Sequence, residues 1–116
     1  MAAKKAHACC LNTVEPVREA LDVINGKWKL PIIISISTGN QRFTDIQKSI
    51  PGITPKVLAK ELKELEQHQL IKRSVVDGYP VKILYSTESY AETLSPIIYA
   101  LRDWGENHRK RIFGKE

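Results

Sequence analysis

The stretch RFTDIQKSIPGITPKVLAKELKELE, residues 42–66, decides the fold because it has the pattern of two short helices separated by a tight turn. Pro51 and Gly52 are turn formers that end the first helix. Thr54 is a suitable N-cap for the second helix, and Pro55 suits its first position, where a missing N–H costs nothing. A helix, a short turn containing glycine and a second helix form a helix-turn-helix unit.

The second helix has two different faces on a helical wheel of about 100° per residue. With Lys56 at zero, Lys60 and Lys63 fall within about 40° of it. The opposite side carries leucines: Leu58, Leu62 and Leu65. The acidic residues cancel the lysines in sum but lie on the flanks of the wheel: Glu61, Glu64 and Glu66. The continuous lysine stripe favours insertion into the DNA major groove, whereas an ordinary amphipathic pair with a solvated outer face is the alternative.

The length of the chain predicts one domain, and its composition is typical of a soluble globular protein. Its 116 residues are enough for a single core, and 18 Lys and Arg against 13 Asp and Glu give a net charge of +5. That excess suits a polyanionic partner. No apolar run approaches the ~18 residues needed to cross a bilayer, and the N-terminus has no signal-peptide core. We therefore expect a cytoplasmic protein with no membrane partner.

The N-terminal stretch, residues 1–12, shows no apolar periodicity, and we interpret it as a mobile arm before a domain at residues 13–116. It contains two adjacent cysteines, Cys9 and Cys10. Cytoplasmic thiols are expected to be reduced unless they act as a redox sensor. Because consecutive Cα atoms lie only about 3.8 Å apart, a disulfide here would more readily join two chains than these neighbours. Inert thiols are the alternative.

Two further helices are expected before residue 42. The first is opened by Pro16 and closed by Gly26, and its apolar residues recur at helical spacing: Val17, Ala20, Leu21 and Ile24. The second begins close to Trp28, because Pro31 is tolerated only near the first turn of a helix. Isoleucines nearly saturate the surface of this second helix, so it should be central to the core.

Beyond the lysine-striped helix, the apolar period changes from helical to alternating. Residues 71–76 and 81–86 are rich in β-formers and flank the turn-forming residues 77–80, which predicts a hairpin. Arg73 and Lys82 lie on this hairpin, close enough to its tip to reach over a phosphate backbone.

A long helix over residues 89–110 is expected to complete the chain, with either Thr87 or Ser89 as its cap. Pro96 must lie in the first turn of this helix or mark a kink. Its apolar stripe comprises Leu94, Ile97, Ile98, Leu101, Trp104 and His108. So long a stripe predicts a homodimer through the same helix of a second copy. Packing against the domain's own first helix is the alternative for half of it.

Three helices, a hairpin and a flanking helix describe an α+β winged helix-turn-helix, with residues 42–66 as the helix-turn-helix and residues 71–86 as the wing. Over residues 16–104 the chain resembles the HxlR family of bacterial transcriptional regulators, which are MarR-like. The motifs that carry the resemblance are Gly26-Lys27-Trp28, Arg42-Phe43, Pro51-Gly52-Ile53, residues 58–66 and Trp104-Gly105.

The resemblance implies a DNA-binding regulator, repressor or activator, that forms a homodimer through its N- and C-terminal helices and binds an inverted repeat in double-stranded DNA. It implies the following DNA contacts: Thr54, Pro55, Lys56 and Lys60 on the recognition helix, Lys27 and Arg42 as backbone anchors, and Arg73, Tyr79 and Lys82 on the wing. Lys63 lies about a turn further along the helix, so we expect it to contact the DNA backbone. It does not imply a particular effector.

Two departures from the family pattern stand out. Several members carry a redox-sensing cysteine directly before the proline that opens the first helix, but here that position is Glu15. Cys9 and Cys10 lie upstream, so thiol sensing is shifted, altered or absent. In residues 86–90 the chain also lacks the leucine and glycine that the family tends to show around the threonine, which affects the approach to the last helix.

A winged helix that meets an acidic protein partner and binds no DNA is the rival interpretation. An enzyme is not expected, because the sequence shows no Gly-rich phosphate loop and no Ser/His/Asp or Cys/His grouping. The histidines fall in three different elements: His7, His68 and His108. His7 with Cys9 and Cys10 lacks evident further metal ligands, so neither a metal nor another cofactor is expected.

Overall fold

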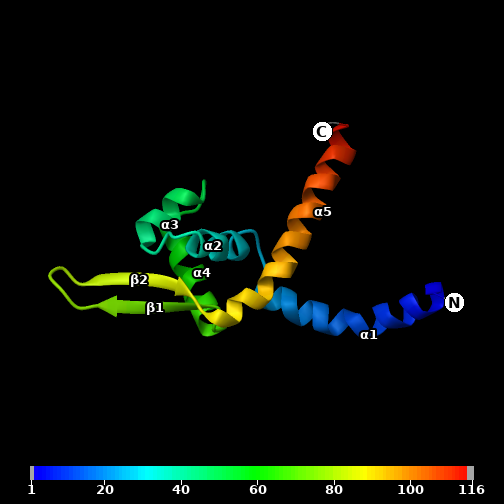
Figure 1. Cartoon of the computed structure of the whole chain (residues 1–116), viewed down its shortest axis with the longest axis horizontal. Helices are drawn as coiled ribbons and strands as arrows, with labels where there is room; N and C mark the ends of the chain where they lie inside the picture. Colours follow the sequence, from blue (N-terminus) through cyan, green and yellow to red (C-terminus); the bar gives the residue numbers. More distant parts are fainter. Residues whose placement is uncertain (1, 115–116) are drawn as a thin grey trace.

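The computed structural model describes the backbone of residues 2–114 and the side chains of residues 12–114. Its elements, in chain order, are α1 (Ala2–Val23), α2 (Lys29–Ser37), α3 (Phe43–Ser49), α4 (Pro55–Gln67), β1 (Ile71–Val76), β2 (Lys82–Thr87), the 3₁₀ helix η1 (Ser89–Leu94) and α5 (Ser95–Phe113) (Figure 1). Helices α2, α3 and α4 pack together beside an antiparallel hairpin, and α5 follows. The α+β winged helix-turn-helix prediction is confirmed.

Helix α2 lies at the centre of the core because isoleucines cover it. Ile32, Ile33 and Ile36 are 0%, 3% and 4% exposed. The neighbouring helices add Ile46 from α3 and the leucines predicted from helical spacing on α4: Leu58, Leu62 and Leu65. Pro31 lies in the first turn of α2, where it removes no hydrogen bond that the helix needs.

The hairpin is fixed to the helices at its base and free at its tip. Ile71 of β1 is 1% exposed and pairs with Thr87 of β2. Tyr85 packs against the core, and its backbone N–H donates to the carbonyl of Gln41 at 2.8 Å. The outer half of the hairpin extends away from the helices (Figure 1).

The first helix is longer than the sequence analysis predicted. It begins at Ala2 rather than at Pro16, so Pro16 lies inside it. Figure 1 shows α1 extending from the helical core on the side opposite the hairpin. Residues 12–22 are all exposed. An alanine-rich start has high helix propensity, but residues 2–12 show no apolar periodicity in the sequence, so a search for an apolar stripe misses this part of the helix. The division into an arm and a domain stays a prediction.

The C-terminal element also differs from the single helix expected over residues 89–110. Residues Ser89–Leu94 form η1, and α5 begins only at Ser95, so neither Thr87 nor Ser89 caps it. Pro96 lies in the first turn of α5, one of the two placements predicted for it. The missing N–H of a proline is tolerated in a first turn, which explains why α5 begins there. No residue of α5 is buried.

Among the side chains of residues 12–114, one charged group lies inside the core. Lys29, the first residue of α2, is 2% exposed. Its Nζ donates to Glu61 Oε1 at 2.5 Å, to Glu64 Oε1 at 2.6 Å and to Asn25 Oδ1 at 3.2 Å. Burial alone would lower the pKa of Lys29, but the hydrogen bonds and negative charges of Glu61 and Glu64 raise it above its ordinary value. The hydrogen bond from Lys29 in turn lowers the pKa of the Glu64 carboxyl below its ordinary value. We call these four residues the Lys29 cluster.

Replacing Lys29 with Met should lower the free energy of unfolding by about 3 kcal/mol, because Glu61 then loses its cationic partner at a site where its side chain is 12% exposed. Urea denaturation followed by circular dichroism measures the change. Lys48→Met, at an exposed position of α3, is the matched control and should change stability by less than about 0.5 kcal/mol. Equal losses in the two variants would contradict a structural role for the Lys29 cluster.

Candidate nucleic-acid interface

Helix α4 has a well-formed start. Thr54 is its N-cap, and the Oγ1 of Thr54 accepts a hydrogen bond from the backbone N–H of Val57 at 3.2 Å. Pro55 is the first helical residue. Gly52, in the preceding turn, has a φ of +89°, a conformation that side chains disfavour. These features confirm the predicted turn and N-cap, and an N-cap of this kind contributes about 1 kcal/mol to helix stability.

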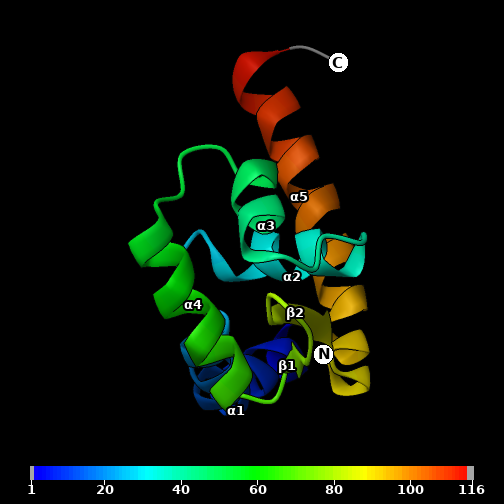
Figure 2. The ribbon, with the colours of Figure 1, turned by 90° about the vertical axis from the view of Figure 1, so that its left-hand side faces the viewer.

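Three lysines project from α4 on the side away from the core, and we call them the lysine face: Lys56, Lys60 and Lys63. All three are exposed, as the helical wheel predicted. The Nζ of Lys60 lies 3.8 Å from Glu64 Oε2, and the Lys60 side chain is 69% exposed. An exposed ion pair of this kind contributes little energy, so Lys60 stays available to an anion. Figure 2, in which the hairpin points toward the viewer, shows α4 along its length at one edge of the molecule.

Two of the acids on α4 are paired with Lys29 rather than with solvent alone. Glu61 and Glu64 both accept hydrogen bonds from the buried Lys29 ammonium, which offsets part of their negative charge. The lysine face is therefore more positive than the sequence of α4 alone suggests. Sequence reasoning missed this role of Lys29. The available signal was a lysine in a helix built largely of isoleucines, where a buried charge requires acidic partners.

Lys27 and Arg42, the residues predicted to contact the DNA backbone, lie at the starts of α2 and α3. Lys27 is exposed, and its Nζ lies 4.8 Å from the centroid of the Trp28 ring. Arg42 is exposed and precedes α3 as its N-cap residue, in an extended conformation. Both side chains are accessible to an anionic partner, and their role in binding DNA stays a prediction.

The hairpin register places the predicted wing residues on different surfaces. Arg73 pairs with Tyr85, whereas Lys82 pairs with Val76. Since successive residue pairs of a hairpin face opposite sides, Arg73 and Lys82 lie on opposite faces of the wing. The sequence analysis grouped them without this distinction, because it had no register. Tyr79 lies in the turn at the tip and is fully exposed.

The six residues predicted for a dimer interface fall into two groups. Leu94 ends η1 and packs against the core of its own chain, and Ile98 is half-buried. Three others are 43%, 52% and 67% exposed on α5: Ile97, Leu101 and Trp104. The Trp104 ring stacks on His108, with 4.8 Å between the ring centroids. The exposed members form an apolar surface along α5, and surfaces of this kind often mark an interaction site.

The remaining expectations concern thiols, metals and membranes. Cys9 and Cys10 belong to the backbone of α1, but their side chains, like that of His7, lie outside the described residues. Among the side chains that the structure describes, no group of three or more His, Cys, Asp or Glu residues could hold a metal ion. Within residues 2–114, no helix combines the length and the apolar character needed to span a bilayer.

Comparison with known sequences gives the family. The model of the HxlR-like helix-turn-helix family matches residues 23–113. YdeP of Bacillus subtilis, named as an uncharacterized HTH-type transcriptional regulator, is 39% identical over 97 residues, which cover 84% of this chain and 76% of YdeP. YtcD of the same organism, named in the same way, is 37% identical over 98 residues, which cover 84% of this chain and 78% of YtcD.

Solved structures agree with the sequence comparison. The redox regulator HypR in its reduced form matches with a TM-score of 0.78 and 35% identity, covering 85% of this chain and 98% of the HypR chain. The reduced form of YodB from Bacillus subtilis matches with a TM-score of 0.69 and 31% identity, covering 77% of this chain and 87% of the YodB chain. The chain therefore belongs to the HxlR-like helix-turn-helix family of transcriptional regulators.

Proposed function

We propose that this protein is a sequence-specific DNA-binding transcriptional regulator that acts as a homodimer on an inverted-repeat operator. The observation that carries the proposal is the lysine face of α4, which is exposed while Glu61 and Glu64 are held by Lys29. Its relatives are named as HTH-type transcriptional regulators, which supports the same function. A capped helix with a cationic outer face suits insertion into the major groove.

The proposed contacts of α4 differ in how deep they lie in the DNA major groove. Residues at the start of a recognition helix approach the base edges, so Thr54, Pro55 and Lys56 supply the contacts that distinguish sequences. Lys60 lies one turn further on, and Lys63 reaches the phosphate backbone. Phosphate contacts set the position of the protein without distinguishing sequences.

The remaining predicted contacts lie outside α4. Lys27 and Arg42 bind phosphates beside the recognition helix. The wing residues Arg73, Tyr79 and Lys82 contact the backbone or the minor groove. Since Arg73 and Lys82 occupy opposite faces of the hairpin, a given wing orientation presents only one of them to the same DNA strand.

Exposed apolar side chains at both ends of the chain support the homodimer. In addition to the α5 surface, α1 exposes three such side chains, at 51%, 46% and 54%: Val14, Val17 and Leu21. A second copy that packed against α1 and α5 would bury both surfaces in one symmetric interface. Such a dimer would present its two α4 helices about 34 Å apart, one turn of the DNA duplex.

A protein-interaction module is the second candidate function. The observation that favours it is the outer half of the wing, where apolar side chains are at least 40% exposed: Val75, Val76, Val81 and Ile83. Apolar side chains do not neutralise phosphates. A protein of this class would show no salt-dependent affinity for random duplex DNA, which distinguishes it from the regulator.

Lys63→Ala should weaken binding to operator and random duplex by the same factor and reduce the slope of log affinity against log salt by about 0.9, as expected for one lost phosphate contact. Lys56→Ala should also lower the ratio of operator to random affinity by about tenfold, because one base contact is lost. Fluorescence anisotropy at several salt concentrations measures both quantities, with an operator obtained by selecting bound genomic fragments.

Lys110→Ala, in the last turn of α5, is the control for a lost positive charge outside the interface and should leave sequence discrimination unchanged. If Lys56→Ala left affinity and discrimination as they are, the assignment of the recognition face would be wrong. If the unmodified protein showed no salt-dependent binding to any duplex, the protein-interaction module would be the better interpretation.

Leu101→Asp should raise the dimer dissociation constant at least about tenfold, because it places a charge within the apolar surface of α5. Sedimentation equilibrium over a range of protein concentrations measures the constant. Val81→Asp is the matched control, because Val81 is 57% exposed, close to the 52% of Leu101, but lies on the wing. Identical dissociation constants for Leu101→Asp and the unmodified protein would show that α5 does not form the interface.

We also propose Cys9 and Cys10 as thiols through which oxidation regulates DNA binding. The support is the likeness to HypR, which is named as a redox regulator. Diamide should change operator affinity at least about fivefold, dithiothreitol should reverse the change, and the Cys9→Ser/Cys10→Ser double variant should not respond. Operator affinity that is the same before and after diamide treatment would identify these cysteines as inert.

A further inference from the structure

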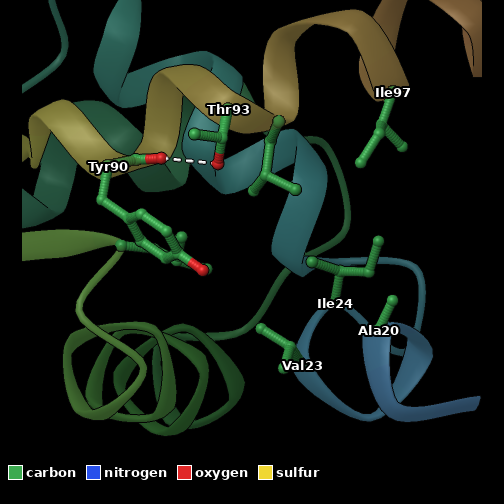
Figure 3. Close-up of a pocket in the computed structure, with 8 residues that line it drawn as sticks. Ala20, Val23, Ile24, Tyr90, Thr93 and Ile97 are labelled. Atoms are coloured by element: carbon green, nitrogen blue, oxygen red, sulfur yellow. Dashed lines mark hydrogen bonds between the residues drawn. The ribbon is translucent and has the colours of Figure 1, made fainter. Parts of the chain in front are cut away.

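Lys27 lies in the short connection between α1 and α2, and the backbone is anchored on both sides of it. Val23 ends α1 and Ile24 follows it, and their side chains line a small pocket together with residues of η1 and α5 (Figure 3). Asn25, the next residue, belongs to the Lys29 cluster. On the other side, Trp28 is the N-cap residue of α2. The backbone of Lys27 therefore has a fixed place in the fold.

The indole ring of Trp28 connects Lys27 to the helix-turn-helix unit. This ring is half-buried and packs against the core. The Nζ of Lys27 lies over the ring, 4.8 Å from its centroid. The ring also reaches the turn before α4, because a Cβ added at Gly52 would lie 3.9 Å from Cη2 of Trp28. Since Thr54, the N-cap of α4, follows Gly52 by two residues, the Lys27 ammonium is held beside the turn that leads into α4.

The charge of Lys27 is not offset by a neighbouring acid. Among the side chains of residues 12–114, none of the ion pairs involves Lys27. The face of an aromatic ring attracts a cation without cancelling its charge. An ammonium group also has three N–H donors, so it can keep one side on the ring and direct its donors outward. Lys27 thus presents a free positive charge in a restricted position.

We propose that Trp28 is a positioning residue for DNA binding, which holds Lys27 against one phosphate beside the start of α4. The inference rests on the proposed function and deepens it, because it names the group that orients a predicted backbone contact. Phosphate contacts set the register of a protein on the duplex. A phosphate bound at Lys27 would therefore help to place the start of α4 opposite its bases.

The benefit of this arrangement is pre-organisation. A lysine side chain that moves freely loses rotamer freedom when it binds a phosphate, and this loss lowers affinity. Contact with the Trp28 ring restricts Lys27 before DNA arrives, so less freedom is lost on binding. A cation–π contact at an exposed position corresponds to a change of about 2- to 5-fold in affinity.

A double-mutant cycle on Lys27 and Trp28 tests the coupling, with operator affinity measured by fluorescence anisotropy. Trp28→Met removes the ring but retains an apolar side chain that fills space adaptably. Its effect on operator affinity should be about 2- to 5-fold larger in the presence of Lys27 than in the Lys27→Ala background. If Trp28 served only the packing of the core, the substitution would weaken binding by the same factor in both backgrounds.

Phe43→Met is the matched control for the loss of a ring. Phe43 is another half-buried aromatic residue that packs against the core, but its ring has no cation above it in the described structure. Its effect should be the same with Lys27 and with Lys27→Ala. Trp28→Phe, which keeps an aromatic face for the ammonium, should bind within about twofold of the unmodified protein. Circular dichroism confirms folding, and Trp28→Leu enters the same cycle if Trp28→Met does not fold.

A scan of the operator with methylphosphonates locates the phosphate, because each replacement removes one negative charge from the DNA backbone. At one position, the replacement should weaken binding of the unmodified protein but not of Lys27→Ala. Trp28→Met should be less sensitive than the unmodified protein at that same position. Lys63→Ala should keep full sensitivity there, because Lys63 is assigned to a different phosphate.

Two results would overturn the inference: equal effects of Trp28→Met with and without Lys27, or an operator in which no phosphate is coupled to Lys27. Either result, obtained with a protein that binds its operator, would leave the proposed function standing. A protein that bound no duplex DNA would instead refute the proposed function, and this inference with it.

Discussion

The arrangement of this small domain depends on a buried ammonium shared between two carboxylates. Lys29 begins α2, and its hydrogen bonds to Glu61 and Glu64 join α2 to the inner side of α4. A buried charge is tolerated only with close partners, so the pairing restricts how α4 can sit on the core. The same pairing withdraws negative charge from the helix that carries the lysine face. One contact thus serves both the packing of α4 and its electrostatic character.

Local sequence signals predicted helix α4 well. The N-cap at Thr54, the leucines that face the core and the lysines that face outward all follow from helical period and capping preferences, which are short-range properties. The start of α5 at Ser95 follows from the constraint that Pro96 imposes, although η1 before it carried no clear signal. The hairpin was likewise predicted, from the alternating period of its apolar residues.

What the sequence did not predict depends on contacts between distant residues or on the absence of a buried face. The Lys29 cluster joins residues more than thirty positions apart, so no periodicity reveals it. The register that separates Arg73 from Lys82 is set by strand pairing. The start of α1 was predicted at Pro16 rather than at Ala2, because the first half of this helix has no apolar stripe. The radius of gyration, 17.6 Å, exceeds the about 13 Å typical of a compact chain of this size, which reflects how far α1 and α5 extend.

Glu64 also determines how charge would be balanced in the proposed complex with DNA, in which Lys60 binds a phosphate. Its Oε1 lies 2.6 Å from Lys29 and its Oε2 lies 3.8 Å from Lys60, so the carboxylate has a strong inner partner and a weak outer one. If Lys60 turned toward a phosphate in the proposed complex, Glu64 would keep Lys29 and would not be left as a bare negative charge beside the duplex. The outer lysine can thus exchange partners while the inner lysine continues to compensate the acid.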